Sequence, residues 1–115
     1  MFKNKYVTKG VMAEVPVYLQ MLMWGMIDNM EVDEKDYLQI FRLNGSGDKV
    51  QKIVHEQEVP RYRKEYYVPV CEGGVVDNKV YVIDDGDYCT MLLAEEYWFK
   101  NEDANEYRIL GFIFL

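Results

Sequence analysis

The feature that most constrains this fold is a contrast between one helical segment near the start and a series of short, strand-like runs after it. From Pro16 to Met30, large apolar residues recur every three or four positions, which indicates one face of a helix. Pro16 fits the first helical position, and Gly25 in the interior suggests the close approach of a strand. A helix this apolar is expected to be covered on more than one side. The apolar face consists of Leu19, Leu22, Met23, Met26 and Met30, and it is widened by Tyr18, Met21 and Ile27.

The rest of the chain alternates between turn residues and runs rich in β-branched and aromatic residues. These runs predict strands over 5–11, 37–43, 49–59, 61–70, 80–84, 87–93 and 106–114. Asn44-Gly45 and Asp85-Gly86 are hairpin signals, and the second predicts a type I′ turn. We expect Gly10 to mark a bulge or bend in the first strand and Pro69 to mark an edge strand.

The segment after Asp85-Gly86 has two interpretations. The favoured one is a strand to about Leu93 followed by a helical turn over 94–97, and the alternative is one helix over 87–97, because Met-Leu-Leu-Ala-Glu-Glu is a good helix-forming string. Together the segments predict a single α+β domain over residues 1–115. In this domain one long helix packs on a mostly antiparallel sheet of about six strands.

The charge of the chain is unevenly distributed. The net charge is −7, with +1 over residues 1–64 and −8 over residues 65–115. The acidic half repels nucleic-acid phosphate. Acidity keeps small domains soluble, and it also suits a partner with a basic surface, such as a protein that itself handles DNA or RNA. We therefore expect a protein with a basic surface, rather than nucleic acid, as the partner.

The cysteines and the absence of targeting segments predict the compartment. Cys71 and Cys89 lie 18 positions apart without a metal-binding spacing, which predicts two reduced thiols in a reducing cytosol. The alternative is one disulfide between neighbouring strands. The first residues lack the apolar stretch of a secretory signal, and no apolar run approaches the ~18 residues of a membrane span. The sequence therefore predicts a cytoplasmic protein with no membrane partner.

Candidate catalytic residues are few. His55 is the only histidine, and a lone histidine in a strand is typical of a structural role. As a general base it would need an orienting carboxylate, which neither Glu56 nor Glu58 is placed to supply. We expect no catalytic residue, cofactor or metal, and hence no enzyme. A metal-dependent hydrolase at Asp84–Asp87 is the least favoured alternative, because the spacing does not match a calcium loop.

Three acidic groups are the candidate partner-binding residues. The first group follows the predicted helix, the second surrounds the Asp-Gly turn, and the third lies in the segment 94–97. Their members are Glu31, Asp33, Glu34 and Asp36, then Asp84, Asp85 and Asp87, then Glu95 and Glu96. Negative charge after the C-terminus of a helix interacts unfavourably with the helix dipole. The first group therefore does not stabilise the helix end, and a contact with a partner protein is one explanation for it. The simpler interpretation is a solvent-exposed connector. Asp84 and Asp87 would repel one another across the turn, and a cation or a partner's arginine would relieve that repulsion.

One basic and aromatic patch supports the alternative function, a small nucleic-acid-binding module. Its residues are Arg61, Arg63, Lys64, Tyr66 and Tyr67. Such side chains stack on bases and neutralise phosphates of single strands. With only three positive charges on a chain of net charge −7, this alternative ranks below protein binding.

The apolar end of the last predicted strand suggests a second kind of partner. Residues 109–114 are apolar on both faces of the strand, so they are expected to be central, covered or part of an interface. The interface alternative predicts a homodimer.

Several strings agree in order and spacing with a known pattern. They are Tyr6-Val7-Thr8-Lys9-Gly10 followed by Pro16 and Leu19-Gln20, Asp36-Tyr37-Leu38-Gln39-Ile40-Phe41, Gln57-Glu58-Val59-Pro60, and Ile83-Asp84-Asp85-Gly86 leading to Thr90–Tyr97. Over residues 5–97 the chain resembles domain of unknown function 960, an uncharacterised family of Firmicutes and their phages. Residues 98–115 look like an extension beyond the usual end of the family. The resemblance implies cytoplasmic residence and association with mobile elements, and it supplies no catalytic residue. Small phage proteins often bind a host machine, so it favours an inhibitor of a nucleic-acid-handling defence protein, similar to an anti-CRISPR.

Overall fold

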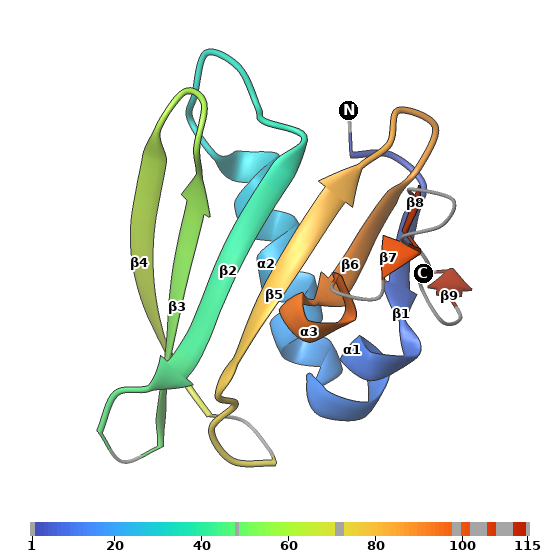
Figure 1. The fold of residues 1–115 in the computed structure, drawn as a ribbon. Coiled ribbons are helices and arrows are strands. Elements are labelled where there is room, and N and C mark those ends of the chain that lie inside the picture. Colours follow the sequence, from blue (N-terminus) through green and yellow to red (C-terminus); the bar gives the residue numbers. More distant parts are fainter. Residues whose placement is uncertain are drawn as a thin grey trace.

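A mixed β-sheet with helix α2 packed against one face forms the frame of this fold (Figure 1). The computed structural model describes residues 2–47, 49–70, 73–97, 100–101, 106–107 and 112–114. The strands of the main sheet are β1 (Lys5–Thr8), β2 (Leu38–Gly45), β3 (Val50–Gln57), β4 (Tyr62–Pro69), β5 (Asn78–Asp84), β6 (Cys89–Leu93) and β9 (Phe112–Phe114). The helices are α1 (Lys9–Glu14), α2 (Val17–Asn29) and α3 (Ala94–Tyr97). Two further short strands, β7 (Lys100–Asn101) and β8 (Glu106–Tyr107), pair with one another in a separate antiparallel sheet.

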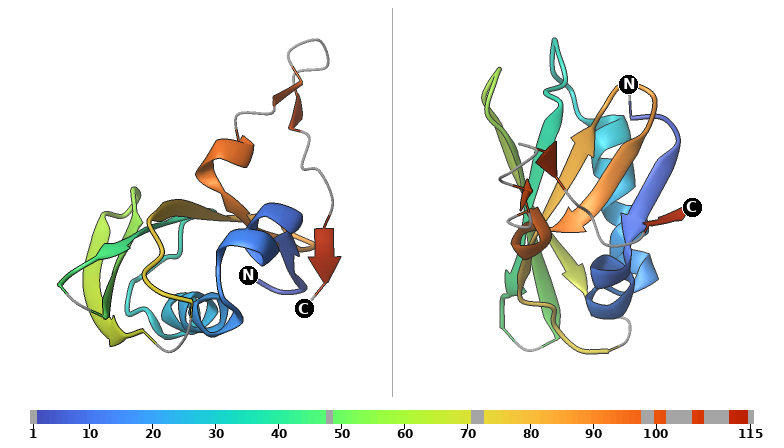
Figure 2. Two further views of the ribbon diagram at one scale, coloured as in Figure 1. Left: turned by 90° about the horizontal axis from the view of Figure 1, so that it is seen from below. Right: turned by 45° about the vertical axis from the view of Figure 1, so that its right-hand side comes forward.

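The sheet order is β4-β3-β2-β5-β6-β1-β9. Strand β1 runs parallel to β6, and the other neighbouring strands of this sheet pair antiparallel. The predicted α+β class is confirmed, and the sheet is mixed because of its one parallel pair. Helix α2 covers one face, here called the helix face, whereas α3 lies on the opposite face (Figure 2). There the ring of Tyr97 contacts the ring of Tyr81.

The helical part is not the single long helix that was predicted. Helix α2 agrees with the predicted 16–30, but α1 precedes it, so the expected strand over 5–11 is wrong beyond Thr8. The Thr8 hydroxyl accepts a hydrogen bond from the Val11 backbone N–H at 3.2 Å, which caps α1, and donates one to Glu96 Oε1 at 2.6 Å. Gly10 lies within α1 and forms no bulge. A Cβ atom there would come 2.6 Å from Glu96 Oε2, so Gly10 permits this close approach of α3.

The described residues cover helix α2 on one side only. Its buried residues pack against the sheet, whereas Met21 is 59% and Leu22 37% exposed, so the expected cover on more than one side is wrong. The expected close approach at Gly25 is also wrong, because a Cβ atom there would meet no described atom within 4 Å. Among the described residues, no helix is long and apolar enough to cross a membrane.

The hairpin predictions are confirmed, with one difference in turn type. Strands β2 and β3 pair around the Asn44-Gly45 signal, and β5 pairs with β6 around Asp85-Gly86. The strand to Leu93 and the helical turn α3 are therefore right, and the alternative helix over 87–97 is wrong. The Asp85 N–H donates to the Tyr88 carbonyl at 2.9 Å, and only Gly86 has positive φ, which is the requirement of a type II′ rather than a type I′ turn.

One of the two edge strands of the main sheet was predicted as an edge strand, and the other was not. Strand β4, which ends at Pro69, is an edge strand as predicted. The predicted strand over 106–114 corresponds to two short strands, β8 and β9, and β9 lies at the other edge beside β1, not centrally. Residues 108–111, which include part of the apolar run, lie outside the described residues.

The core contains buried glutamines beside its apolar residues. The apolar part joins α2 to the helix face through large side chains such as Leu19, Met23, Phe41, Ile53 and Met91. The buried polar residues with it are Thr8, Gln20, Gln39, Gln51, His55, Gln57 and Thr90. Glutamine is usually exposed, so four glutamines at 2% exposure or less require hydrogen-bond partners inside the fold.

We predict that Thr8→Ala destabilises the chain by about 1–2 kcal/mol, because α1 loses its cap and Glu96 loses a donor. Thr8→Ser retains the hydroxyl and should remain close to wild type. Urea unfolding of the three proteins tests this. A Thr8→Ser variant as unstable as Thr8→Ala would show that the hydroxyl is not the cause.

Candidate functional site

Two buried glutamines hold the acidic connector between α2 and β2 in place. The Gln57 side-chain amide donates to the Glu34 carbonyl at 3.0 Å, and its oxygen accepts from the Asp36 N–H at 2.9 Å. Gln39 donates to the Asp36 carbonyl at 3.0 Å and to the Gln57 side-chain oxygen at 2.8 Å. The connector therefore has a fixed course, although it has no regular secondary structure.

His55 belongs to the same buried network. Its Nε2 lies 2.6 Å from Gln39 Oε1, which faces it as an acceptor because the Gln39 amide nitrogen donates elsewhere. The ring stacks on Phe41 at 4.5 Å, and Nδ1 has no hydrogen-bond partner among the described residues. Burial lowers the pKa of His55 to about 4. His55 is neutral and enclosed at physiological pH, in agreement with the structural role that was predicted.

The first two acidic groups lie at the same end of the sheet. The connector 30–37 and the β5–β6 hairpin at 84–88 lie at the top in Figure 1. The Asp84 N–H donates to the Tyr37 carbonyl at 2.9 Å and joins the two loops. These two loops are here called the acidic end. Its exposed carboxylates are Glu31, Asp33, Glu34, Asp85 and Asp87, whereas Asp36 and Asp84 are half-buried.

Three of the nine predicted acidic residues bond backbone groups within the fold. Asp36 Oδ2 accepts from the Val59 N–H at 3.2 Å. The carboxylate of Asp84 accepts from the backbone N–H groups of Phe2 and Gly86 at 3.3 and 3.0 Å. Glu96 Oε1 accepts from the Leu93 N–H at 2.8 Å as well as from Thr8. These contacts give the three carboxylates roles in holding loops and α3.

The third acidic group does not join the other two. Strand β6 runs away from the β5–β6 hairpin, so Glu95 and Glu96 on α3 lie toward the far end of the sheet (Figure 1). Within the acidic end, partial desolvation of the largely exposed Asp85 raises the pKa of its carboxyl, and the neighbouring charge of Asp84 raises it further. No three His, Cys, Asp or Glu side chains in the described part of the chain are grouped so that they could hold a metal ion.

The predicted basic and aromatic patch is divided between the two faces of β4. Its residues are Arg61, before the strand, and Arg63, Lys64, Tyr66 and Tyr67 within it. Tyr66 packs against the core on the helix face, with the Lys64 ammonium 5.2 Å from its ring centroid. On the opposite face Glu65 accepts from Arg63 at 2.6 Å and from the Tyr67 hydroxyl at 3.0 Å. The strand therefore presents no single basic surface, and an acidic residue lies at its centre.

The described cysteine is a buried free thiol. Cys89 is fully buried and donates to the Lys3 carbonyl at 3.4 Å. Burial raises its pKa to about 11, so the thiolate is disfavoured. Cys89 takes part in no disulfide, as the favoured prediction had it, and Cys71 lies outside the described residues.

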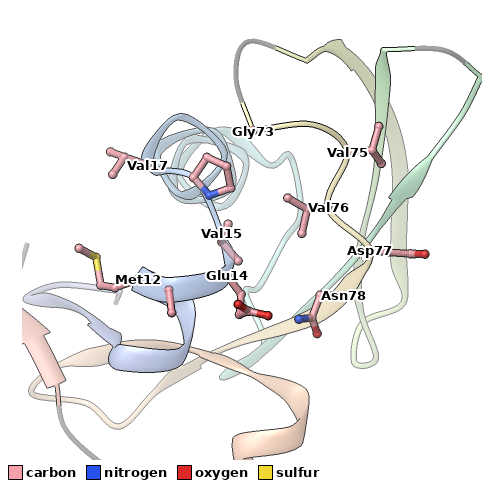
Figure 3. A pocket seen from close by; sticks show the side chains of 11 residues that line it. Met12, Glu14, Val15, Val17, Gly73, Val75, Val76, Asp77 and Asn78 are labelled. Carbon is pink, nitrogen blue, oxygen red and sulfur yellow. The ribbon is translucent and has the colours of Figure 1, made fainter.

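A pocket of about 480 Å³ lies at the other end of the molecule, between the α1–α2 corner and the segment before β5 (Figure 3). It is here called the corner pocket. The residues around it are Met12, Ala13, Glu14, Val15, Pro16, Val17, Gly73, Val75, Val76, Asp77 and Asn78. Val15 and Val76 face one another across it, Glu14 points inward near Asn78, and Asp77 points away (Figure 3). The sequence analysis singled out none of these residues for binding.

Comparison with known proteins places the chain in a family. Residues 4–96 match the family described as Staphylococcal protein of unknown function (DUF960). The chain belongs to this family. The match confirms the resemblance that the sequence indicated over residues 5–97, and it ends before the segment 98–115.

The DUF960 chain also has a structural neighbour. It resembles the crystal structure of a protein of unknown function from Enterococcus faecalis, with a TM-score of 0.70 and 24% sequence identity. The likeness covers 81% of this chain and 89% of that one, and at this identity it shows a shared fold. Among curated proteins, none matches.

Sequence reasoning missed the buried glutamines, although a signal for two of them was present. Gln51 and Gln57 alternate with Ile53 and His55, so all four share one face of a predicted strand. Because three of these four residues are polar, the alternation pattern does not identify this as the buried face. Only the loops that bond them reveal which side is inside.

We predict that His55 makes the stability of this DUF960 chain depend on pH. Its pKa in the folded state, about 4, lies below the value of 6.5 expected when unfolded, so the unfolded state takes up the proton first. Stability attributable to His55 is therefore fully present above pH 6.5 and lost as pH falls through about 4. At pH 5 the loss should reach about 2 kcal/mol.

Urea unfolding at pH 7, 5.5 and 4.5 of the wild type and of His55→Gln isolates this contribution. Glutamine can donate to Gln39 but does not titrate, so the variant should lose less stability on acidification. The same pH dependence in both proteins would contradict the assignment.

Proposed function

We propose that this chain is a non-enzymatic protein-binding domain whose acidic end docks on a basic surface of a partner protein. The observation that carries the proposal is that two acidic loops, far apart in sequence, lie at the same end of the sheet, with their bases joined by the backbone bond from Asp84 to Tyr37 (Figure 1). Charged surfaces of opposite sign speed the encounter of two proteins and help to select the partner.

The charge balance of this end supports a basic partner. Together with the N-terminal segment and the neighbouring β3–β4 turn, it carries eight carboxylates and three basic side chains. The carboxylates are Glu31, Asp33, Glu34, Asp36, Glu58, Asp84, Asp85 and Asp87, and the basic residues are Lys3, Lys35 and Arg61. The excess of negative charge at one end of a chain of net charge −7 favours partners with clustered lysine and arginine.

The reactive side chains of the described residues support a non-enzymatic role. His55 and Cys89 are both fully buried. Burial lowers the pKa of His55 and raises the pKa of Cys89, so both side chains are favoured in their neutral forms. A general base or a nucleophile needs access to its substrate and a suitable ionisation state. Neither group has these properties here.

A narrower hypothesis follows from the family. Proteins that handle nucleic acid carry basic surfaces, so an acidic domain suits the inhibition of such a protein in the cytoplasm, in the manner of an anti-CRISPR of a phage or mobile element. Direct binding of nucleic acid through Arg61, Arg63, Lys64, Tyr66 and Tyr67 is the alternative outcome. Glu65 between these residues makes it the weaker one.

The test is affinity capture from a staphylococcal lysate on the tagged full chain, followed by mass spectrometry and salt elution. We expect a stoichiometric basic protein that elutes between about 0.1 and 1 M salt, because screening shortens the reach of charges over this range. The double variant Asp33→Asn, Asp87→Asn should weaken capture about 2- to 30-fold.

A matched control removes the same charge elsewhere. Glu65→Gln with Glu95→Gln alters two exposed carboxylates outside both the acidic end and the corner pocket, and it should capture the partner like the wild type. Equal capture by both double variants, or capture of nucleic acid without a stoichiometric protein, would contradict the proposal.

A further inference from the structure

We infer that the corner pocket binds a short segment of a partner protein in which a lysine or arginine lies beside a large apolar side chain. This site lies at the opposite end of the sheet from the acidic end and does not depend on it. Its volume of about 480 Å³ falls within the range of about 300–1,000 Å³ typical of ligand pockets.

The interior of the corner pocket suits an apolar side chain. Val15 and Val76 form opposite walls (Figure 3), and Pro16 also lines the pocket. A Cβ atom at Gly73 would lie 3.9 Å from Pro16 Cγ, so the two segments are in close reach at that side. Gly73 also has φ of 74°, which favours glycine at this bend.

The charge of the corner pocket suits a basic side chain. Glu14 is exposed and points inward beside the Asn78 amide, so a carboxylate faces the pocket (Figure 3). Of the described residues that line the pocket, none is basic. A second copy of this chain, with its net charge of −7, is electrostatically a poor occupant, whereas a basic segment is complementary.

Exposed apolar side chains border the corner pocket on its helix side and on its strand side (Figure 3). Met12 is 41%, Val17 57% and Val75 39% exposed, and Met21 follows Val17 by one helical turn. Clustered apolar side chains on a surface mark interaction sites. These side chains add apolar surface around the pocket, so a peptide segment fits the site better than a compact small molecule does.

Both walls are held rigid by buried glutamines. The Gln20 side-chain amide donates to the Val15 carbonyl at 2.8 Å. Gln51 accepts from the Val76 N–H at 2.7 Å and donates to the Val76 carbonyl at 3.0 Å. A site ordered before binding loses less entropy when its ligand binds, so the pocket is prepared for an occupant.

The experiment is an NMR titration of the isotope-labelled full chain with three blocked tripeptides, Leu-Arg-Leu, Leu-Glu-Leu and Ser-Arg-Ser. We expect Leu-Arg-Leu to shift the amide signals of 12–17 and 73–78 in a saturable manner, and the other two to bind the pocket more weakly. Glu14→Gln should reduce affinity for Leu-Arg-Leu about 2- to 5-fold. Val17→Ser should weaken it by removing apolar contact, and Glu95→Gln should leave it unchanged.

Three results would overturn the inference. They are no saturable shift at 12–17 and 73–78, equal binding of Leu-Glu-Leu there, and shifts of these signals that depend on protein concentration alone, which would identify a second copy as the occupant. Shifts confined to 30–37 and 84–88 would support the acidic end and reject the corner pocket, so the two proposals fail separately.

Discussion

Hydrogen bonds from buried glutamine side chains to loop backbone groups are the interaction on which both candidate surfaces depend. Backbone N–H and C=O groups next to a core need partners, and a loop has none from a helix or a strand ladder. Gln39 and Gln57 supply them to the connector at the acidic end. Gln20 and Gln51 supply them to the two walls of the corner pocket. One residue type thus orders both ends of the molecule, and each surface is preorganised for a partner.

Local patterns predicted the strands and hairpins of this fold well, because alternation and turn residues act over a few positions. The helix after Pro16 and the turn at Asp85-Gly86 are examples. Helix α1 was missed because its stability comes from a distant residue: Glu96 accepts from the Thr8 side chain, and it lies where Gly10 leaves room. A window around residues 5–11 shows only β-branched alternation, so no local rule separates this segment from a strand.

The candidate surfaces were less predictable than the fold. Acidic residues were recognised from the sequence, but their convergence depends on the strand order, which brings Tyr37 beside Asp84 and carries Glu95 away. The structural duties of Asp36, Asp84 and Glu96 also depend on backbone groups remote in sequence. The corner pocket had no signal of its own, because apolar residues of a predicted helix are ordinarily assigned to the core. The 59% exposure of Met21, which was assigned to the apolar face, corrects that assignment for this residue.

The most direct test of the glutamine account is amide hydrogen exchange of the wild type, Gln51→Leu and Gln57→Leu. The Val76 N–H bonds Gln51, and the Asp36 N–H bonds Gln57. The account predicts that Gln51→Leu speeds exchange at Val76 more than at Asp36, and that Gln57→Leu does the reverse. Unchanged exchange at both amides, or an equal acceleration of both in each variant, would contradict it.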